Sequence, residues 1–383
     1  MKATTRLFSV AVSVAALFTA TSAYAATVWV ATNGRDTPTC GPSRSQACRS
    51  ISAGIARANV GDLVLVGPGR YGDIDYDLQF VTPGDEAANP TLGCIVCIEK
   101  RVTVASTDGA DATLIDAGQP QPGQSLPAGL NRTVVIAASG VRFGAAGQGF
   151  TVNALEFNAV QVRDVGDIRL IGNVVKGGIS SFQIRFQGGP LYVAQNKALN
   201  ATTGIDVTTF DGSAATVVDN FATGNSTGFN IGGNSQHTIA SNKASRNGIG
   251  FFISTHVSGG GGYRISNNIA SASDTGFVFN NAALIFQRNT AVGNEVGFHD
   301  FGEPNNPANS FHTNNMIGNF RCGFLNASGT HVDATNNFWG SAAGPAPKPS
   351  DAVCNEPFII NTPGAPPPFP STTTVVPFAT KAF

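Results

Sequence analysis

The sequence predicts an all-β chain wound as a parallel β-helix, with a short capping helix at its N-terminal end. Asparagine recurs every 21 to 26 residues along the second half of the chain, and glycine follows eight residues after six of these asparagines. The recurring asparagines are Asn173, Asn196, Asn220, Asn242, Asn268, Asn289, Asn315 and Asn337. A period with one constant and one variable half indicates a solenoid, in which each repeat forms one coil.

Three short apolar patterns in each period predict three strands in each coil. Residues that follow the recurring glycine alternate between apolar and variable, as at 205–207 and 229–231. A second apolar pair precedes the asparagine, as in Leu191 and Val193, and a small or apolar residue follows it, as in Ala198. A spacing of two residues places one side of each strand in the core, whereas a helix would show a spacing near 3.6.

The recurring asparagines are interpreted as a structural ladder, with a polar binding track as the alternative. Neighbouring coils lie about 4.8 Å apart, which lets side-chain amides bond to one another along a column. Asparagine tolerates the left-handed backbone of a sharp corner, and we expect the recurring glycines to supply that conformation at a second corner. The composition fits such a fold, since 45 of 383 residues are glycine and only 12% are charged.

Residues 1–25 read as an export signal. Lys2 and Arg6 form a basic head, 7–18 is apolar, and Ala23 to Ala25 offers a small-residue cleavage site. The apolar stretch is too short to span a membrane, and no later segment is apolar enough to do so. Cleavage near Ala25 predicts a secreted or periplasmic protein.

Six cysteines in an exported chain predict disulfides. Six cysteines allow many pairings, and proximity along the chain favours Cys40–Cys48, Cys94–Cys97 and Cys322–Cys354. A redox-active pair at Cys94 and Cys97 is the alternative, but the βα context of such pairs is missing.

The N-terminal segment predicts a cap for the open end of the solenoid. Residues 28–31 read as a strand and 50–58 as a short helix, with Ser50 at its N-cap and Asn59 and Gly61 at its end. A helix there would cover the first sheet edge, which otherwise invites association.

Several segments resemble the right-handed parallel β-helix proteins of the pectin-lyase-like superfamily. The resembling segments are 48–51, 61–71, 101–106, 115–117, 336–340 and 344–345. The resemblance implies a right-handed single-stranded parallel β-helix over 26–345. The Pro-rich tail, 346–383, is expected not to pair into the sheets, because proline lacks the backbone donor, but to cap the last coil.

The resemblance implies polysaccharide as the substrate class, but not one activity. The superfamily includes lyases, glycoside hydrolases, esterases and adhesins, and fold does not determine function. The paired aspartates of its hydrolases, the motifs of its esterases and the Arg-x-Pro-x-x-Arg of its main pectate-lyase group are absent. No catalytic residue is therefore carried over from the superfamily.

The candidate site follows from the predicted stacking of coils. Outward residues at one strand position lie about 5 Å apart on neighbouring coils. That row contains Gln183, Asp206, Asn230 and Phe252, with Arg185 diagonal to Asp206 and His256 in a nearby glycine-rich loop. Amides and an aromatic ring suit sugar binding, and Arg185 with Asp206 offers the charge and the base that a lyase needs. An ordinary solvated sheet face is the alternative.

These observations predict an exported, monomeric protein that binds or processes polysaccharide, with a non-catalytic surface scaffold or adhesin as the alternative. If it is an enzyme, a lyase is favoured over a glycoside hydrolase, because Asp206 has no second carboxyl on the neighbouring coils. Asp73, Asp75 and Asp77 alternate and offer a calcium site, with solvated loop acids as the alternative. The net charge of −1 gives no indication of nucleic-acid binding.

Overall fold

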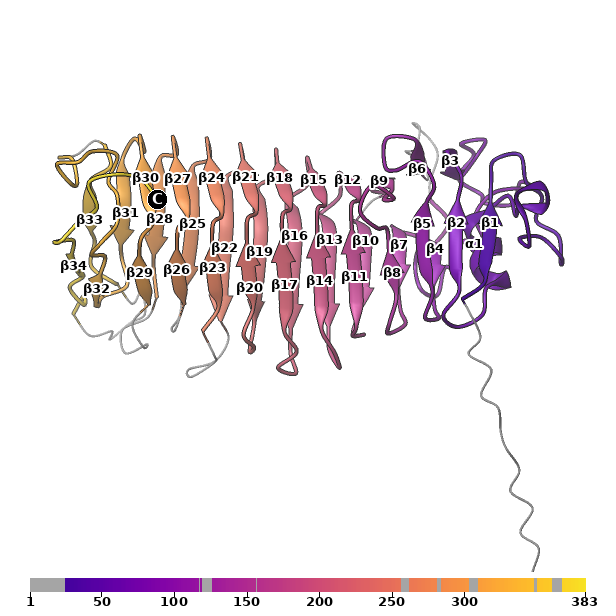
Figure 1. Ribbon diagram of the computed structural model, residues 1–383, viewed down its shortest axis with the longest axis horizontal. Coiled ribbons are helices and arrows are strands. Elements are labelled where there is room, and N and C mark those ends of the chain that lie inside the picture. The colour runs from indigo at the N-terminus through magenta and orange to yellow at the C-terminus, as the bar shows by residue number, and fades with distance from the viewer. Residues whose placement is uncertain are drawn as a thin grey trace, which may run out of the picture.

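A computed structural model shows an elongated right-handed parallel β-helix (Figure 1). The structure describes residues 25–116, 118, 126–155, 157–255, 262–280, 284–302, 309–347, 350–359 and 367–383. In this part of the chain, each coil adds one strand to each of three parallel sheets, and consecutive coils stack along the rod. The architecture implied by the superfamily resemblance is therefore confirmed. The described residues contain no helix that is long and apolar enough to span a membrane.

The three sheets run the length of the rod. Sheet A contains β1 (Thr27–Val30), β2 (Leu63–Val66), β5 (Thr103–Ser106), β8 (Arg142–Phe143), β11 (Ile168–Ile171), β14 (Leu191–Ala194), β17 (Ala215–Val218), β20 (Thr238–Ala240), β23 (Arg264–Ser266), β26 (Ile285–Gln287) and β29 (Ser310–His312). Sheet B contains β3 (Gly69–Gly72), β6 (Thr113–Asp116), β9 (Thr151–Asn153), β12 (Val174–Lys176), β15 (Lys197–Leu199), β18 (Phe221–Thr223), β21 (Lys243–Ser245), β24 (Ile269–Ser271), β27 (Thr290–Val292) and β30 (Asn315–Ile317). Sheet C contains β4 (Cys94–Ile98), β7 (Arg132–Ile136), β10 (Asn158–Arg163), β13 (Ser180–Phe186), β16 (Thr203–Thr209), β19 (Thr227–Gly233), β22 (Ile249–Thr255), β25 (Thr275–Asn280), β28 (Val296–Asp300), β31 (Cys322–Asn326) and β33 (Val353–Asn355).

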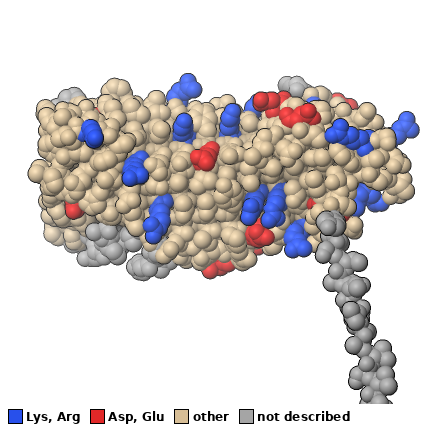
Figure 2. All heavy atoms as spheres, viewed as in Figure 1, with Lys and Arg blue, Asp and Glu red and all other residues tan. Residues whose placement is uncertain are grey.

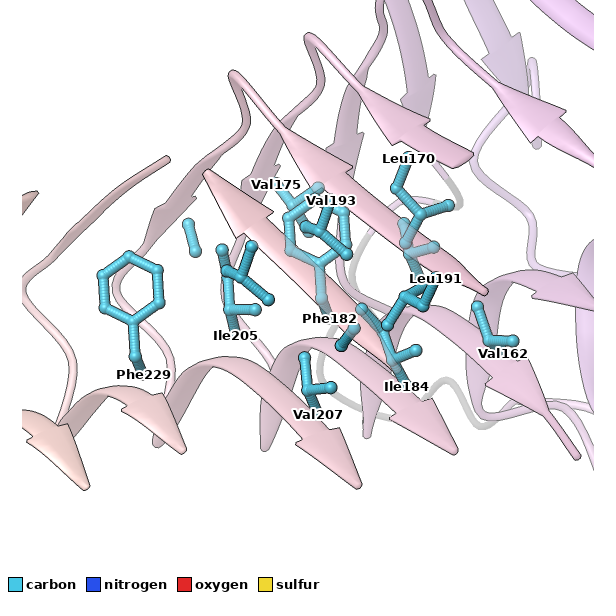
Figure 3. Packing of buried hydrophobic residues seen from close by; sticks show 14 of the residues in the cluster. Val162, Leu170, Val175, Phe182, Ile184, Leu191, Val193, Ile205, Val207 and Phe229 are labelled. Atoms are coloured by element: carbon cyan, nitrogen blue, oxygen red, sulfur yellow. The ribbon is translucent and has the colours of Figure 1, made fainter. Parts of the chain in front are cut away.

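The predicted inward positions form the core. Side chains from all three sheets meet inside the coils, as Leu191 of sheet A and Phe182 of sheet C do in Figure 3. Phenylalanine stacks on itself along sheet C, with ring centroids 4.7, 4.8 and 4.6 Å apart from Phe229 through Phe251 and Phe277 to Phe298. Each such aromatic pair contributes about 0.5–1.5 kcal/mol beyond the burial of its area.

The asparagine ladder forms the corner between sheets A and B. Its members are Asn173, Asn196, Asn220, Asn242, Asn268, Asn289, Asn314 and Asn337, and all are buried. Each Oδ1 accepts the backbone N–H of the preceding member at 2.7–3.1 Å and its side-chain Nδ2 at 2.9–3.2 Å. The prediction of Asn315 was wrong, because Asn314 occupies the ladder, while Asn315 begins β30 and donates to Thr290 Oγ1 at 3.0 Å.

The backbone requirements differ from those expected at both corners. The residue before each ladder asparagine takes the left-handed conformation, as Gln195 (φ 58°) and Asp219 (φ 56°) do, and the asparagine itself does not. The recurring glycines, such as Gly250, also have no positive φ. They are glycine because coils approach closely: a Cβ on Gly250 would lie 2.5 Å from the backbone oxygen of Gly276.

A second buried ladder, which the sequence reading missed, lies between sheets B and C. Five of its members, Asn225, Asn247, Ser273, Asn294 and Asn319, lie five residues after a first-ladder asparagine, and Asp351 ends it. Asn225 Nδ2, for example, donates to Asn247 Oδ1 at 3.0 Å. The sequence shows a second recurring asparagine at Asn225, Asn247, Asn294 and Asn319. Ser273 and Asp351 stand in place of asparagine at the other two positions of this ladder, which obscures the pattern.

The N-terminal cap has the predicted helix. Helix α1 (Ile51–Arg57) packs against β1, β2 and β4, and Ser50 Oγ accepts the N–H of Ala53 at 3.1 Å. The buried Glu86 carboxylate also accepts from the N–H groups of Ile51 and Ser52, both at 2.7 Å. A 3₁₀ turn, η1 (Arg44–Gln46), lies in the loop before α1.

The structure contains the three predicted disulfides, Cys40–Cys48, Cys94–Cys97 and Cys322–Cys354. The first closes a loop beside β1, where Val30 and Cys48 form a parallel bridge. The third joins β31 to β33, so it links the last coil to the Pro-rich tail. The disulfides are compatible with a secreted protein; residues 1–24 of the predicted signal lie outside the described segments.

The expectation that the Pro-rich tail cannot pair was wrong in two places. Val353–Asn355 adds β33 to sheet C, and Thr372–Thr374 forms β34, which pairs with β32 (His331–Asp333). Neither strand contains proline, so both keep their backbone donors. The described prolines of the tail precede, separate or follow these two strands, and the tail packs onto the last coil through Asn315, which accepts the N–H of Phe383 at 3.0 Å.

Candidate functional site

The predicted row of outward residues exists on the outer face of sheet C. Gln183, Asp206, Asn230 and Phe252 are direct register partners on β13, β16, β19 and β22. All four are half-buried, while their neighbours on either side in the strand, such as Ile205 and Val207, point into the core. The sheet C row, as we call these aligned outward residues, therefore presents one side chain per coil.

Asp206 is the acidic group of the sheet C row. Its Oδ1 accepts from Asn230 Nδ2 at 2.9 Å. Burial raises the pKa of Asp206, while the Asn230 hydrogen bond and the charge of Arg185 act in the opposite direction. The carboxyl group thus accepts a hydrogen bond from an amide on one neighbouring coil and interacts electrostatically with a cation on the other.

Arg185 lies two residues after Gln183 on β13, with an exposed side chain. Its register partners are Arg163 on β10 and Thr208 on β16. Arg185 therefore extends the site toward the N-terminal coils, where a second arginine occupies the same position.

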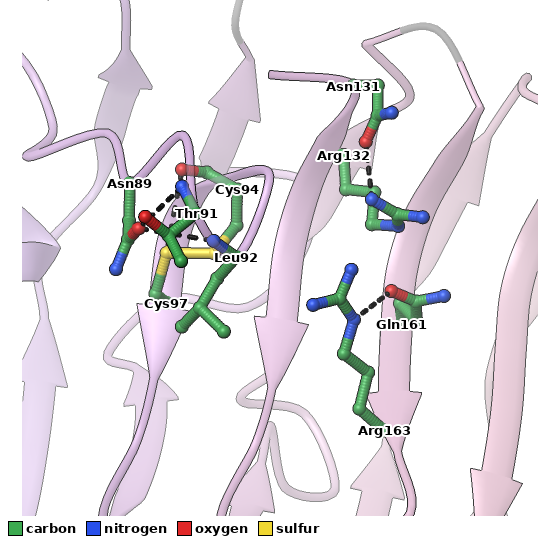
Figure 4. The surroundings of a disulfide bond; sticks show 9 residues. All are labelled: Asn89, Thr91, Leu92, Cys94, Cys97, Asn131, Arg132, Gln161 and Arg163. Carbon is green, nitrogen blue, oxygen red and sulfur yellow. Dashed lines mark hydrogen bonds between the residues drawn. A yellow bond between two sulfur atoms is a disulfide. The ribbon is translucent and has the colours of Figure 1, made fainter. Parts of the chain in front are cut away.

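The structure extends the row toward the N-terminus with residues that the sequence reading missed. Gln161 is the register partner of Gln183, and its Nε2 donates to Gln183 Oε1. Asn158 Nδ2 donates to the same oxygen at 3.1 Å, and Arg163 Nε donates to Gln161 Oε1 at 2.8 Å (Figure 4). The signal was present, because 158–163 (NAVQVR) repeats the polar positions of 180–185 (SSFQIR).

Aromatic side chains dominate the other end of the row. The ring centroids of Phe252 and Phe301 are 6.2 Å apart, and those of Phe301 and His299 are 5.7 Å apart. Burial lowers the pKa of His299, so this ring is neutral over a wider range of pH than a free histidine. The face thus changes from basic and amide groups at β7–β13 to aromatic groups at β22–β28.

Two predicted site features stand apart from the row. His256 lies outside the described residues. The carboxylate oxygens of Asp73, Asp75 and Asp85 lie within 4.8 Å of one another, which is the geometry of a small cation site. Asp77 is not in that group, whose third member is Asp85, and the Asp77 carboxylate accepts from Gln79 N at 2.7 Å. Calcium binding stays a prediction for this loop.

Charged groups are sparse elsewhere on the surface. On the face shown in Figure 2, lysine and arginine side chains are spread along the rod and do not form one dense patch. Three cavities of about 410, 300 and 260 Å³ lie at the N-terminal end, and none of these three is lined by Asp206 or Asn230. The sheet C row therefore lies apart from these three cavities, on the outer face of its sheet.

Comparison with solved structures gives a similarity of fold. No family model matches the chain, and no curated protein matches it. Among solved structures, the A-module of a mannuronan C-5 epimerase from Azotobacter vinelandii aligns over 84% of this chain and 89% of that chain. The sequence identity is 12% and the TM-score is 0.43, so the similarity assigns neither an activity nor a substrate.

Proposed function

We propose that this protein binds polysaccharide along the outer face of sheet C. The observation that supports the proposal is the register of Gln183, Asp206, Asn230 and Phe252, one from each of four successive coils. Coils repeat about every 4.8 Å, so the row offers polar contacts at regular intervals to a ligand that is itself a repeating chain.

The chemistry of the row suits sugars. Amide groups both donate and accept hydrogen bonds, as sugar hydroxyls do. Phe252 and Phe301 offer apolar ring faces beside those amides. A polymer lying along the rod would contact both kinds of group at once.

Lyase-like processing is a second candidate, because Asp206 combines a raised pKa with a neighbouring cation. A lyase uses a base to remove a proton next to a carboxylate whose charge is neutralised. Asp206 would act as the base, and Arg185 would neutralise the substrate carboxylate. A retaining glycosidase would need a second carboxyl about 5–5.5 Å from the first, and the two register partners of Asp206 are Gln183 and Asn230.

The test is binding of the purified mature chain to a panel of neutral and acidic polysaccharides. We expect Phe252→Ala to weaken binding about three- to tenfold, the effect of losing roughly 0.5–1.5 kcal/mol of aromatic contact. Tyr192→Ala is the matched control, because Tyr192 is an exposed aromatic residue on the outer face of sheet A.

Processing is tested by following unsaturated product by ultraviolet absorbance, with and without calcium. The lyase candidate predicts product from wild type and none from Asp206→Asn. Binding without product would leave a non-enzymatic polysaccharide-binding protein. No binding and no product across the panel would leave the alternative, a scaffold or adhesin.

A further inference from the structure

The largest of the three cavities lies where the first coils leave sheet A. It measures about 410 Å³, which falls within the range of about 300–1,000 Å³ typical of small-molecule sites. Its wall includes Ala31, Gly67 and Thr107, which directly follow β1, β2 and β5. These strands are successive neighbours in sheet A, so the cavity spans three coils along the corner between sheets A and B.

The asparagine ladder does not extend into these coils. By the strand register, Ala31, Gly67 and Thr107 hold the position that Asn173 holds on its own coil. None of the three has a side-chain amide, so the hydrogen bonds that close this corner from Asn173 onward cannot form here. The same corner is therefore closed by the ladder farther along the rod and hollow at its N-terminal end.

Trp29 supplies an aromatic wall of the cavity. It lies half-buried on β1 between Val28 and Val30, whose side chains belong to the core. The guanidinium carbon of Arg44 lies 4.5 Å from the centroid of the Trp29 ring. The other tryptophan of the chain, Trp339, is only 1% exposed. Trp29 is therefore the tryptophan that can respond to a ligand.

Three polar side chains of the cavity keep hydrogen-bonding capacity. Among the described residues, the Asn33 amide and the Arg44 guanidinium make no hydrogen bond. The Asp108 carboxylate accepts from its neighbour Thr107 Oγ1. Arg44 and Asp108 line the same cavity without pairing, since neither belongs to the ion pairs found in the described segments. The cavity thus offers a cation, an anion and an amide to a ligand.

This mixture of groups selects one chemical class of ligand. An anion would pair with Arg44 but meet the like charge of Asp108, and a cation would do the reverse. An apolar molecule would remove both groups from water without replacing their hydrogen bonds. A sugar avoids these costs, because its hydroxyls donate to the carboxylate and accept from the guanidinium. The C–H face of its ring can pack on the apolar surface of Trp29.

We propose that this cavity binds one unit of a neutral sugar. The site goes beyond the proposed function, because it lies at the corner of sheets A and B on coils that carry no part of the sheet C row. Its ligand is a free monosaccharide or the end unit of a glycan, which present the same ring and hydroxyls. A comparison of a monosaccharide with its disaccharide distinguishes these two sources.

Tryptophan fluorescence of the purified mature chain measures binding at this site. The probes are glucose, galactose, mannose and a disaccharide of each, with the matching uronates and amino sugars as charged counterparts. We expect at least one neutral sugar to give a saturable change in Trp29 emission at about millimolar concentration. It should bind at least about threefold more tightly than either charged counterpart. Tighter binding of the disaccharide would support the end of a glycan as the ligand, and equal affinity would support the free sugar.

Substitution of the two charged side chains tests which groups hold the sugar. Arg44→Gln and Asp108→Asn should each weaken binding about tenfold, because each removes a charge-assisted hydrogen bond. Arg35→Gln and Asp111→Asn are matched controls and should leave the affinity unchanged, since both residues are exposed and neither lines this cavity. Titration calorimetry gives the affinities independently of fluorescence, and thermal unfolding checks that each variant is folded.

Trp29→Phe should abolish the change in emission, because the remaining Trp339 is buried. A change that persists in this variant would overturn the site. Phe252→Ala should leave the change intact, and its loss there would place the ligand on sheet C and also overturn the site.

No saturable change in emission and no heat of binding with any of these sugars would overturn the site, whatever the sheet C row binds. Tighter binding of a uronate or an amino sugar would overturn it as well, since the cavity would then select a charge. Equal losses in Arg44→Gln and Arg35→Gln would have the same consequence. The site and the proposed function can therefore fail separately.

Discussion

The asparagine ladder between sheets A and B and the sheet C row run along the same rod, and they differ in one instructive way. The ladder between sheets A and B repeats one residue type, fully buried, with every member bonded to the next. The sheet C row also places one side chain on each coil, but its members are half-buried and include amides, a carboxylate and an aromatic ring. A buried column whose members bond from coil to coil is one that the fold needs, whereas an outward column of varied chemistry is available for a ligand.

The distinction between the two columns is tested most directly by removing one polar side chain from each. Asn242→Ala would leave the N–H and Nδ2 of Asn220, and the oxygens of Val217 and Asn268, with fewer partners in the buried corner. We expect a loss of about 3–5 kcal/mol in the free energy of unfolding, since each unsatisfied buried group costs about 1–3 kcal/mol. Asn230→Ala in the sheet C row should cost less than about 1 kcal/mol, because its side chain is half-buried.

Denaturant unfolding followed by circular dichroism measures both variants. Because coils contact only their neighbours, a repeat protein can lose two-state behaviour, and the unfolding midpoint is the safer quantity. Equal shifts in the two variants would contradict the distinction between the columns.

A buried histidine outside the ladders should make the stability of the fold depend on pH. His237 packs against Tyr263, with ring centroids 4.6 Å apart, and its Nδ1 accepts the N–H of Ala215 at 3.0 Å. Burial lowers the pKa of His237 from 6.5 to about 4. The unfolded chain therefore binds a proton at His237 more readily than the folded chain does. As a result, the free energy of unfolding falls as the pH drops from about 6.5 to about 4.

We expect this loss to reach about 3 kcal/mol at the acid end of that range. His237→Leu should lack it. Glu86 and Asp300 change the free energy of unfolding in the opposite direction, because burial raises their pKa values to about 7 and about 6. Their protonation therefore favours the folded state as the pH falls. The measurement is therefore the difference in unfolding free energy between wild type and His237→Leu from pH 7 to pH 4. A difference that does not change with pH would contradict the prediction.

The recurring glycines offer a test of how closely the backbones of neighbouring coils approach. Gly250→Ala would place a Cβ 2.5 Å from the backbone oxygen of Gly276, so the coils would have to separate locally. We expect a loss of about 1–3 kcal/mol, as for other overpacked sites. Gly67→Ala is the control, since its φ lies outside the left-handed region and the nearest atom to its Cβ would be 3.4 Å away. Thermal unfolding of both variants measures the difference, and equal melting temperatures would remove the close-approach explanation.

The smallest expected effect concerns Asp206. Because burial raises its pKa, the folded state favours the protonated form, and the charged form at neutral pH does not help stability. Asp206→Asn should therefore change the free energy of unfolding by less than about 1 kcal/mol at pH 7 and tend to increase it. A loss comparable with that of Asn242→Ala would place Asp206 with the structural column instead.

The sequence predicted the coil period, the three strands, the sheet C row and the disulfides, because each depends on spacing alone. It placed Asn315 in the ladder instead of Asn314, because the two asparagines are adjacent and the sequence does not distinguish them. The backbone does, since the residue before each ladder asparagine is left-handed. It missed Gln161 and Arg163 because the asparagine period begins at Asn173, after the coil that carries them. The sequence also missed Asp85, which lies beside Asp73 and Asp75 in the folded loop. The shape of that loop cannot be predicted from the spacing of its residues.

Hydrogen exchange with and without bound polysaccharide tests the proposed binding along sheet C most directly, because it reads all three sheets in one measurement. With a polysaccharide that binds in the panel, we expect added protection at β10, β13, β16, β19 and β22 of sheet C and no change in sheets A and B on the same coils. Protection spread equally over the three sheets, or confined to sheet A, would contradict it.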